Sequence, residues 1–176
     1  MIDFKSTGTP RMHLFIGDPG QACNIAWKIS SELGHAYEVK VFQGSRMRTK
    51  AGLFQEFAAA LQFPYYFGNN WDALHDCLED LQWLPADGYV LFLSDSAQLL
   101  AEDHNAVTIL LQVLAQAAEY WATPMTAEHK EVRNRQAKPF HVVFNCLSEQ
   151  ETAMRDKLSC FPYSRSEFPL KNQLDH

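Results

Sequence analysis

Two apolar runs, residues 89–93 and 140–144, constrain the fold of this chain more than any other feature. The first reads Tyr-Val-Leu-Phe-Leu and the second Phe-His-Val-Val-Phe. A nearly continuous apolar run of this length is typical of a strand that is covered on both faces, as in a parallel sheet between layers of helices. We therefore expect both runs to be buried strands.

The rest of the chain alternates between strand and helix patterns, which predicts an α/β fold with right-handed crossovers. Further strands are expected at residues 12–16 and 37–42. Helices are expected at residues 23–33, 50–62, 71–83, 105–121 and 151–158. The tail beyond Pro162 is expected to be irregular. The pattern as a whole predicts a small parallel sheet of three or four strands flanked by helices.

The length of the chain fits one globular domain with extensions, or at most two small domains. The chain has 176 residues, of which 47% are hydrophobic, and a chain of this length can bury well over half of its unfolded surface. The polar N-terminus does not resemble a signal peptide, and no apolar run approaches the length of a membrane span. The four cysteines lie far apart, which indicates neither a disulfide framework nor a zinc motif. We expect a cytoplasmic protein without metal or cofactor.

Charge is distributed unevenly along the chain. Residues 51–129 contain eleven acidic residues and no Lys or Arg, within a net charge of −6. Such a segment repels nucleic acid and attracts a basic protein or a cation. We therefore expect a basic protein partner and no contact with nucleic acid or membrane.

Several of these acids follow one another at helical spacing after Asn70, which is itself a suitable N-cap. They are Asp72, Asp76, Glu79 and Asp80. Like charges at this spacing repel by a few tenths of a kcal/mol per pair. A helix that keeps these acids despite the repulsion can use them to bind a partner. A solvated acidic face is the ordinary explanation. The alternatives are a surface that imitates an anion, a divalent-metal site and a carboxylate pair for acid–base catalysis.

The preceding loop is aromatic, and together with the helix it resembles a known family. Residues 63–78 read FPYYFGNNWDALHDCL, which closely resembles the barstar family of intracellular ribonuclease inhibitors. The shared pattern is a proline, an aromatic pair, Gly and then Asn-x-Asp-Ala-Leu-x-Asp-x-Leu. The resemblance implies a barstar-like domain at residues 36–148, an atypical insertion near residues 126–136, and extensions at 1–35 and 149–176.

The resemblance also implies a function, because in this family the loop and helix enter the active site of a basic ribonuclease. By position, Asp76 matches the carboxylate that replaces a substrate phosphate, and Asp72 matches a second interfacial carboxylate. Tyr66 matches an aromatic residue that packs against a catalytic histidine. Gly68 and Asn70 match contacts made by the loop. The implied role is that of a bacterial immunity or antitoxin protein, with no catalytic residues of its own.

Three departures from the family pattern change the surroundings of this surface. His75 stands where the family has an interface tryptophan, and Glu79 and Asp80 replace small or neutral residues. Gln116 stands where the family has an interfacial glutamate. We therefore expect a cognate ribonuclease other than barnase. Two alternatives stay open: an interaction module for another basic protein, and, more remotely, a metal-dependent hydrolase that uses the helix carboxylates.

Overall fold

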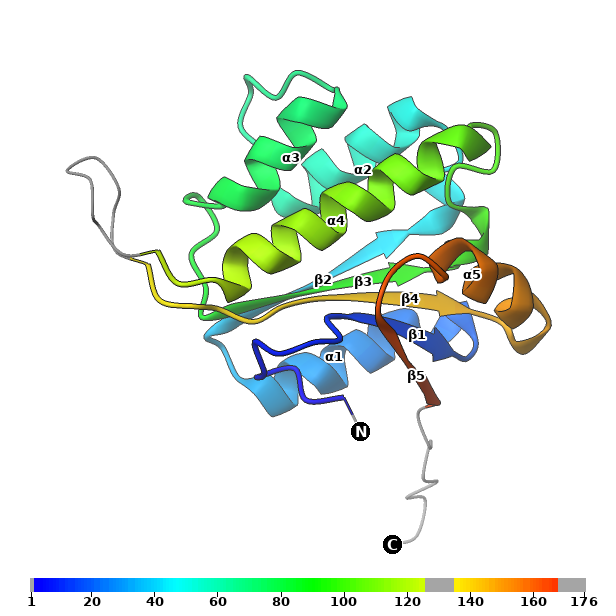
Figure 1. Cartoon of the computed structure of the whole chain (residues 1–176), viewed down its shortest axis with the longest axis horizontal. Coiled ribbons are helices and arrows are strands. Elements are labelled where there is room, and N and C mark those ends of the chain that lie inside the picture. Colours follow the sequence, from blue (N-terminus) through cyan, green and yellow to red (C-terminus); the bar gives the residue numbers. More distant parts are fainter. Residues whose placement is uncertain (1, 126–134, 168–176) are drawn as a thin grey trace, which may run out of the picture.

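Five parallel strands form a single sheet in the order β2-β3-β4-β1-β5 (Figure 1). The computed structural model describes residues 2–125 and 135–167, so the expected insertion near residues 126–136 lies almost wholly outside the described residues. The strands are β1 (Met12–Ile16), β2 (Tyr37–Gln43), β3 (Gly88–Ser94), β4 (Phe140–Cys146) and β5 (Tyr163–Glu167). The α-helices are α1 (Ala22–Leu33), α2 (Lys50–Leu61), α3 (Trp71–Asp80), α4 (Val107–Ala122) and α5 (Glu151–Leu158).

The α/β fold class is confirmed, and the sheet has five strands where three or four were expected. The prediction of an irregular tail beyond Pro162 was wrong, because residues there form β5. Among the described residues this strand pairs only with β1, and its sequence is mostly polar. A polar edge strand carries no apolar run or alternation that sequence reading could detect. In the fold, Arg165 binds both carboxylate oxygens of Glu151, at 2.6 and 3.0 Å.

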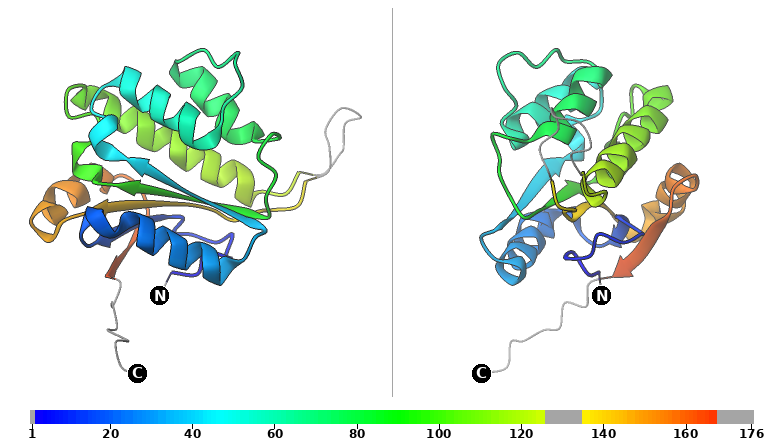
Figure 2. Two further views of the ribbon diagram at one scale, coloured as in Figure 1. Left: turned by 180° about the vertical axis from the view of Figure 1, so that it is seen from behind. Right: turned by 60° about the vertical axis from the view of Figure 1, so that its left-hand side comes forward.

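The sheet lies between two layers of helices, as Figures 1 and 2 show from three directions. Helices α2, α3, α4 and α5 lie over one face, and α1 covers the other. Both β3 and β4 are buried along their whole length, which confirms the expectation from the apolar runs. Side chains alternate between the two cores: Leu91 of β3 belongs to the larger core, and Val90 and Phe92 belong to the core under α1.

Both β1 and α1 come from residues 1–35, the expected N-terminal extension, and β1 lies between β4 and β5 in the sheet. The division of the chain at residues 36 and 148 stays a prediction. None of the helices within residues 2–125 and 135–167 has the length and apolar character needed to cross a membrane.

A buried pair of histidines joins both chain-end segments to the middle of the sheet. His141 Nε2 lies 2.9 Å from the carbonyl oxygen of Ser6, so this nitrogen carries the proton and donates it. Nδ1 of His141 then accepts from Nε2 of His13 at 2.9 Å, and Nδ1 of His13 accepts from the Ser164 hydroxyl at 2.7 Å. Burial and the neighbouring His141 lower the pKa of His13 to about 3, and burial lowers the pKa of His141. Both rings are therefore neutral in the folded protein at neutral pH.

Acidification is expected to destabilise the fold through this pair. Below a pH of about 6.5 the unfolded chain binds protons at His13 that the folded protein excludes, so the free energy of unfolding falls by about 1.4 kcal/mol per pH unit, down to the folded pKa of about 3. Urea unfolding at pH 7 and pH 5 measures this slope. His13→Met should flatten it, whereas His35→Asn, at an exposed histidine, should not. Equal slopes for wild type and His13→Met would contradict the assignment.

Candidate functional site

The loop before α3 is anchored at its base and presents two tyrosines at its tip. The Phe67 ring packs edge-on against Phe54 and Phe63, with centroid distances of 6.2 and 4.8 Å. Beyond this anchor, Tyr65 is fully exposed and Tyr66 is 65% exposed. Their two rings are T-shaped to one another at 5.6 Å. The predicted contact residue Tyr66 therefore projects into solvent from a fixed base.

The end of the loop is fixed by Asn70, the N-cap of α3. Its Oδ1 accepts a hydrogen bond from the Ala73 N–H at 2.8 Å, and its Nδ2 donates to the Gly68 carbonyl at 3.3 Å. A Cβ at Gly68 would lie only 2.9 Å from that Nδ2. The predicted N-cap is confirmed, and both residues also have a structural role, because they set the direction in which α3 leaves the loop.

Loss of this cap is expected to destabilise the protein modestly. Asn70→Ala removes the acceptor for one orphan N–H of the first helical turn and should lower the free energy of unfolding by about 1 kcal/mol. Asn70→Asp keeps an acceptor in the same place and should recover most of that loss. Urea titration of the two variants measures the difference. An alanine variant as stable as wild type would show that the cap contributes nothing.

The outer face of α3 carries acids that no arginine or lysine of the described residues neutralises. Asp72 is exposed, the Asp76 side chain is 83% exposed, and Asp80 is half-buried. Within the described residues, none of the three has a Lys or Arg nitrogen within 4.0 Å. Asp72 and Asp76 are one helical turn apart and therefore project in similar directions.

Other acids of residues 51–129, the segment without Lys or Arg, are neutralised by arginines from outside that segment. The carboxylates concerned are those of Glu56, Glu102 and Glu119, which pair with Arg46, Arg48 and Arg11 at 3.6, 2.9 and 2.7 Å. The acidic character that the sequence spreads over residues 51–129 is thereby reduced at these positions. The carboxylates of Asp72, Asp76 and Asp80, which have no Lys or Arg partner among the described residues, stand out as a result.

Two further predicted residues, His75 and Glu79, turn toward α4 instead of outward. His75 Nε2 lies 3.2 Å from Glu79 Oε1, and His75 Nδ1 lies 3.6 Å from Asp76 Oδ1. Burial raises the pKa of Glu79, and the charge of Asp76 raises it further, while His75 and Arg135 act in the opposite direction. Glu79 is thus a partly desolvated carboxylate, unlike the exposed Asp72 and Asp76 on the outer face.

His75, Glu79 and Gln116 line one groove between α3 and α4, of about 430 Å³. Sequence reasoning missed Arg135, which also lines it. Its guanidinium stacks over the rings of Tyr120 and Trp121, at 4.4 and 4.7 Å, and donates to the Trp121 carbonyl at 3.0 Å. A cation at the carbonyl end of a helix is favourable. The contact between Arg135 and the end of α4 arises only in the folded chain, so no sequence pattern indicates it.

The predicted site residues thus form three adjoining groups. Tyr66, Gly68 and Asn70 belong to the loop, and Asp72, Asp76 and Asp80 belong to α3. His75, Glu79 and Gln116 line the groove. In the described part of the chain, no three His, Cys, Asp or Glu side chains are placed to hold a metal ion.

Two solved structures, of Drosophila ORC with Cdc6 bound to AT-rich DNA and to GC-rich DNA, contain chains that resemble this one. Each has a TM-score of 0.48 and 13% sequence identity. The alignments cover 92% of this chain but only 51% and 52% of the other chains, so this chain spans about half their length. A likeness this weak has no bearing on function.

No curated protein matches the sequence. The match to a protein family, in contrast, covers most of the chain: residues 37–145 match the family described as barstar (barnase inhibitor). This range contains the anchored loop, the acidic helix, the groove, the strands β2 and β3, and β4 except its last residue. The chain belongs to the barstar family.

Proposed function

We propose that this protein inhibits a basic ribonuclease by placing the carboxylates of α3 where the enzyme binds RNA phosphate. The supporting observation is that Asp72 and Asp76 are exposed, lie one turn apart and have no Lys or Arg partner among the described residues. A ribonuclease site holds arginines and lysines arranged for phosphate. Carboxylates can satisfy those donors with charge-assisted hydrogen bonds, which are stronger than neutral ones.

The rigidity of the surface also supports inhibition. The loop is anchored by Phe67, and α3 begins at the Asn70 cap. At its other end, α3 is fixed to α4, because the Trp121 indole N–H donates to the Leu78 carbonyl at 2.8 Å. Groups held in their bound arrangement lose little conformational entropy on association, so more of the contact energy appears as affinity.

In this proposal Asp76 occupies the phosphate position and Asp72 pairs with a second cation. The Tyr66 ring packs against the enzyme beside its active site. Two of the other predicted residues, Gly68 and Asn70, belong to the loop that approaches the enzyme. The remaining ones form the rim of the interface: His75, Glu79, Asp80 and Gln116. The protein would act in the bacterial cytoplasm as an antitoxin or immunity protein.

A second function uses the same surface: binding of a basic protein that is not a nuclease. Capture by the immobilised protein, followed by an RNA-cleavage assay, separates the two. We expect to capture a basic protein that cleaves RNA. Its cleavage of RNA should stop when this protein is added. Asp156→Ala, at an exposed acid on α5, should capture it equally well. Specific capture of a basic protein without nuclease activity would replace ribonuclease inhibition with the second function.

Association with the ribonuclease is expected to slow as salt rises. Complementary fields accelerate encounter at low ionic strength, and the Debye length shortens from about 10 Å at 0.1 M to about 3 Å at 1 M. Between about 0.05 and 0.5 M NaCl the association rate constant should fall by about tenfold or more, with little change in dissociation. Stopped-flow mixing measures both rates. An Asp72→Asn, Asp76→Asn double variant should show a flatter dependence, and a salt-independent rate for the wild type would exclude steering.

A further inference from the structure

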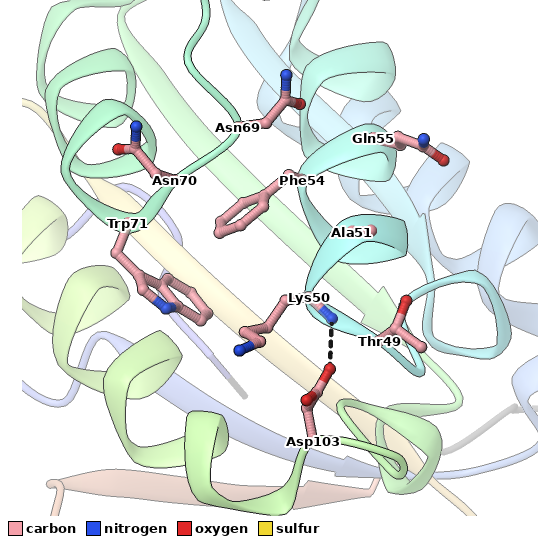
Figure 3. A pocket seen from close by; sticks show the side chains of 9 residues that line it. All are labelled: Thr49, Lys50, Ala51, Phe54, Gln55, Asn69, Asn70, Trp71 and Asp103. Atoms are coloured by element: carbon pink, nitrogen blue, oxygen red, sulfur yellow. Dashed lines mark hydrogen bonds between the residues drawn. The ribbon is translucent and has the colours of Figure 1, made fainter.

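A second cavity, of about 640 Å³, opens beside the start of α3 (Figure 3). It lies between the first turns of α2 and α3, and Asp103, which precedes α4, closes one side. Asn70 lines it as well, so the cavity adjoins the loop described above without including the acidic face of α3. Its volume is within the range of pockets that hold small organic groups, about 300–1,000 Å³.

Aromatic rings form one wall of this cavity. The Phe54 and Trp71 rings meet edge to face with centroids 5.0 Å apart, and both point into the cavity in Figure 3. Phe54 is only 6% exposed and Trp71 is half-buried, so the wall is fixed by the core behind it. A planar ring entering the cavity can pack against these rings in the edge-to-face or offset arrangements that aromatic groups prefer.

Most polar groups around the cavity are already committed to the protein. Thr49 Oγ1 accepts from the Gly52 N–H at 3.1 Å, and Asn70 caps α3. The Asp103 carboxylate accepts from the backbone N–H of Lys50 at 2.9 Å. These groups hold the walls in place and have less capacity left for a ligand.

The Lys50 ammonium is the cation that lines this cavity, and it has no such commitment. Its side chain points into the cavity, toward Trp71, in Figure 3. Among the described residues no carboxylate lies within 4.0 Å of its Nζ. Of the two charged side chains that line the cavity, Asp103 is tied to the Lys50 backbone N–H, and the Lys50 ammonium is the one without a charged partner among the described residues.

We propose that this cavity binds an aromatic ring that carries a negatively charged group. The ring packs against Phe54 and Trp71, and the anionic group meets the Lys50 ammonium. A free aromatic acid and an aromatic-acidic segment of a bound protein both present this chemistry. The site does not depend on ribonuclease inhibition, because it uses neither Asp72 nor Asp76.

Titration of the ¹⁵N-labelled full chain with phenylacetate, followed by NMR, tests the proposal. We expect shifts at the Trp71 indole N–H and at the amides of residues 50–55 and 69–71. Acetate lacks the ring and phenethylamine carries the opposite charge, so each should bind at least about fivefold more weakly. Equal affinity for phenylacetate and phenethylamine, or no shifts at these residues, would overturn the proposal.

Variants separate the cavity from general surface binding. Lys50→Met keeps the aliphatic stem and should weaken phenylacetate binding about fivefold, the scale of one partly exposed ion pair. Ala51→Trp places a large side chain at an exposed lining position and should abolish binding. Lys28→Met, at an exposed lysine of α1 on the other face, should bind as wild type does. An unchanged affinity in Lys50→Met would remove the assigned role of that ammonium.

A final arm identifies the source of the aromatic group. Phenylacetate is titrated again in the presence of the captured ribonuclease. Mutual exclusion, together with weaker ribonuclease binding by Lys50→Met, would show that a segment of the bound enzyme supplies the group, and simultaneous binding would show that the cavity takes a free aromatic acid. Because the first titration contains no ribonuclease, failure of this site and failure of the proposed inhibition are distinguishable.

Discussion

Replacing Asp76 with alanine is expected to weaken binding to the cognate ribonuclease by about 30-fold or more. Removing one member of a desolvated charge pair at an interface costs about 2–5 kcal/mol, because the partner's cation is left without its anion. In the free protein the Asp76 side chain is 83% exposed, and among the described residues its carboxylate lies 3.6 Å from His75 Nδ1. Calorimetric or surface-binding titration of the two proteins measures the change.

Folding is expected to be almost unaffected by the same substitution. An exposed surface change usually alters the free energy of unfolding by less than about 0.5 kcal/mol, and Asp76→Ala also removes repulsion from Asp72 and Asp80 on the same face. Asp76→Asn tests charge at nearly constant shape and should also bind weakly. Asp156→Ala controls for net charge. Wild-type affinity in Asp76→Ala would show that this carboxylate does not contact the enzyme's cations.

Truncation of Trp121 is expected to cause a large loss of stability, about 3–5 kcal/mol. This residue is 5% exposed, its ring lies 5.2 Å from that of Tyr89, and Arg135 stacks over it. Its indole N–H also satisfies the Leu78 carbonyl of α3. Trp121→Ala therefore leaves a cavity and an unpaired buried acceptor. Urea or thermal unfolding measures the loss.

A matched control is available for this prediction. Trp27 lies on α1 and is 70% exposed, so Trp27→Ala should change the free energy of unfolding by less than about 0.5 kcal/mol. Trp121→Phe fills much of the cavity but cannot donate to Leu78, and should fall between the two. Similar stabilities for Trp121→Ala and Trp27→Ala would contradict this account of how α3 is held.

The central strands and the start of α3 were predictable because their signals are local. β3 and β4 are continuous apolar runs, and such runs are difficult to place anywhere but inside a covered sheet. The N-cap of α3 was predictable because the Asn70 side chain bonds to a backbone group three residues away. The motif at residues 63–78 extended this local reading to a family, which the match over residues 37–145 confirms.

The features that were missed depend on residues far apart in the chain. β5 has a polar sequence and exists because β1 offers an unpaired edge. Arg135 reaches the end of α4 through the return of the chain toward β4. Ion pairs such as Arg11–Glu119 bring charge from a flank to the acidic segment. No periodicity or spacing encodes such contacts, and the convergence of His75, Glu79 and Gln116 in one groove has the same origin.

Competition with RNA tests most directly whether the carboxylates of α3 take the place of RNA phosphate. Steady-state cleavage of a short RNA by the cognate ribonuclease is measured over a matrix of RNA and protein concentrations. We expect competitive inhibition, in which rising RNA concentration restores the full rate and the Asp72→Asn, Asp76→Asn variant requires a much higher concentration to inhibit. Inhibition that is independent of RNA concentration, or equally strong in that variant, would contradict occupation of the phosphate site.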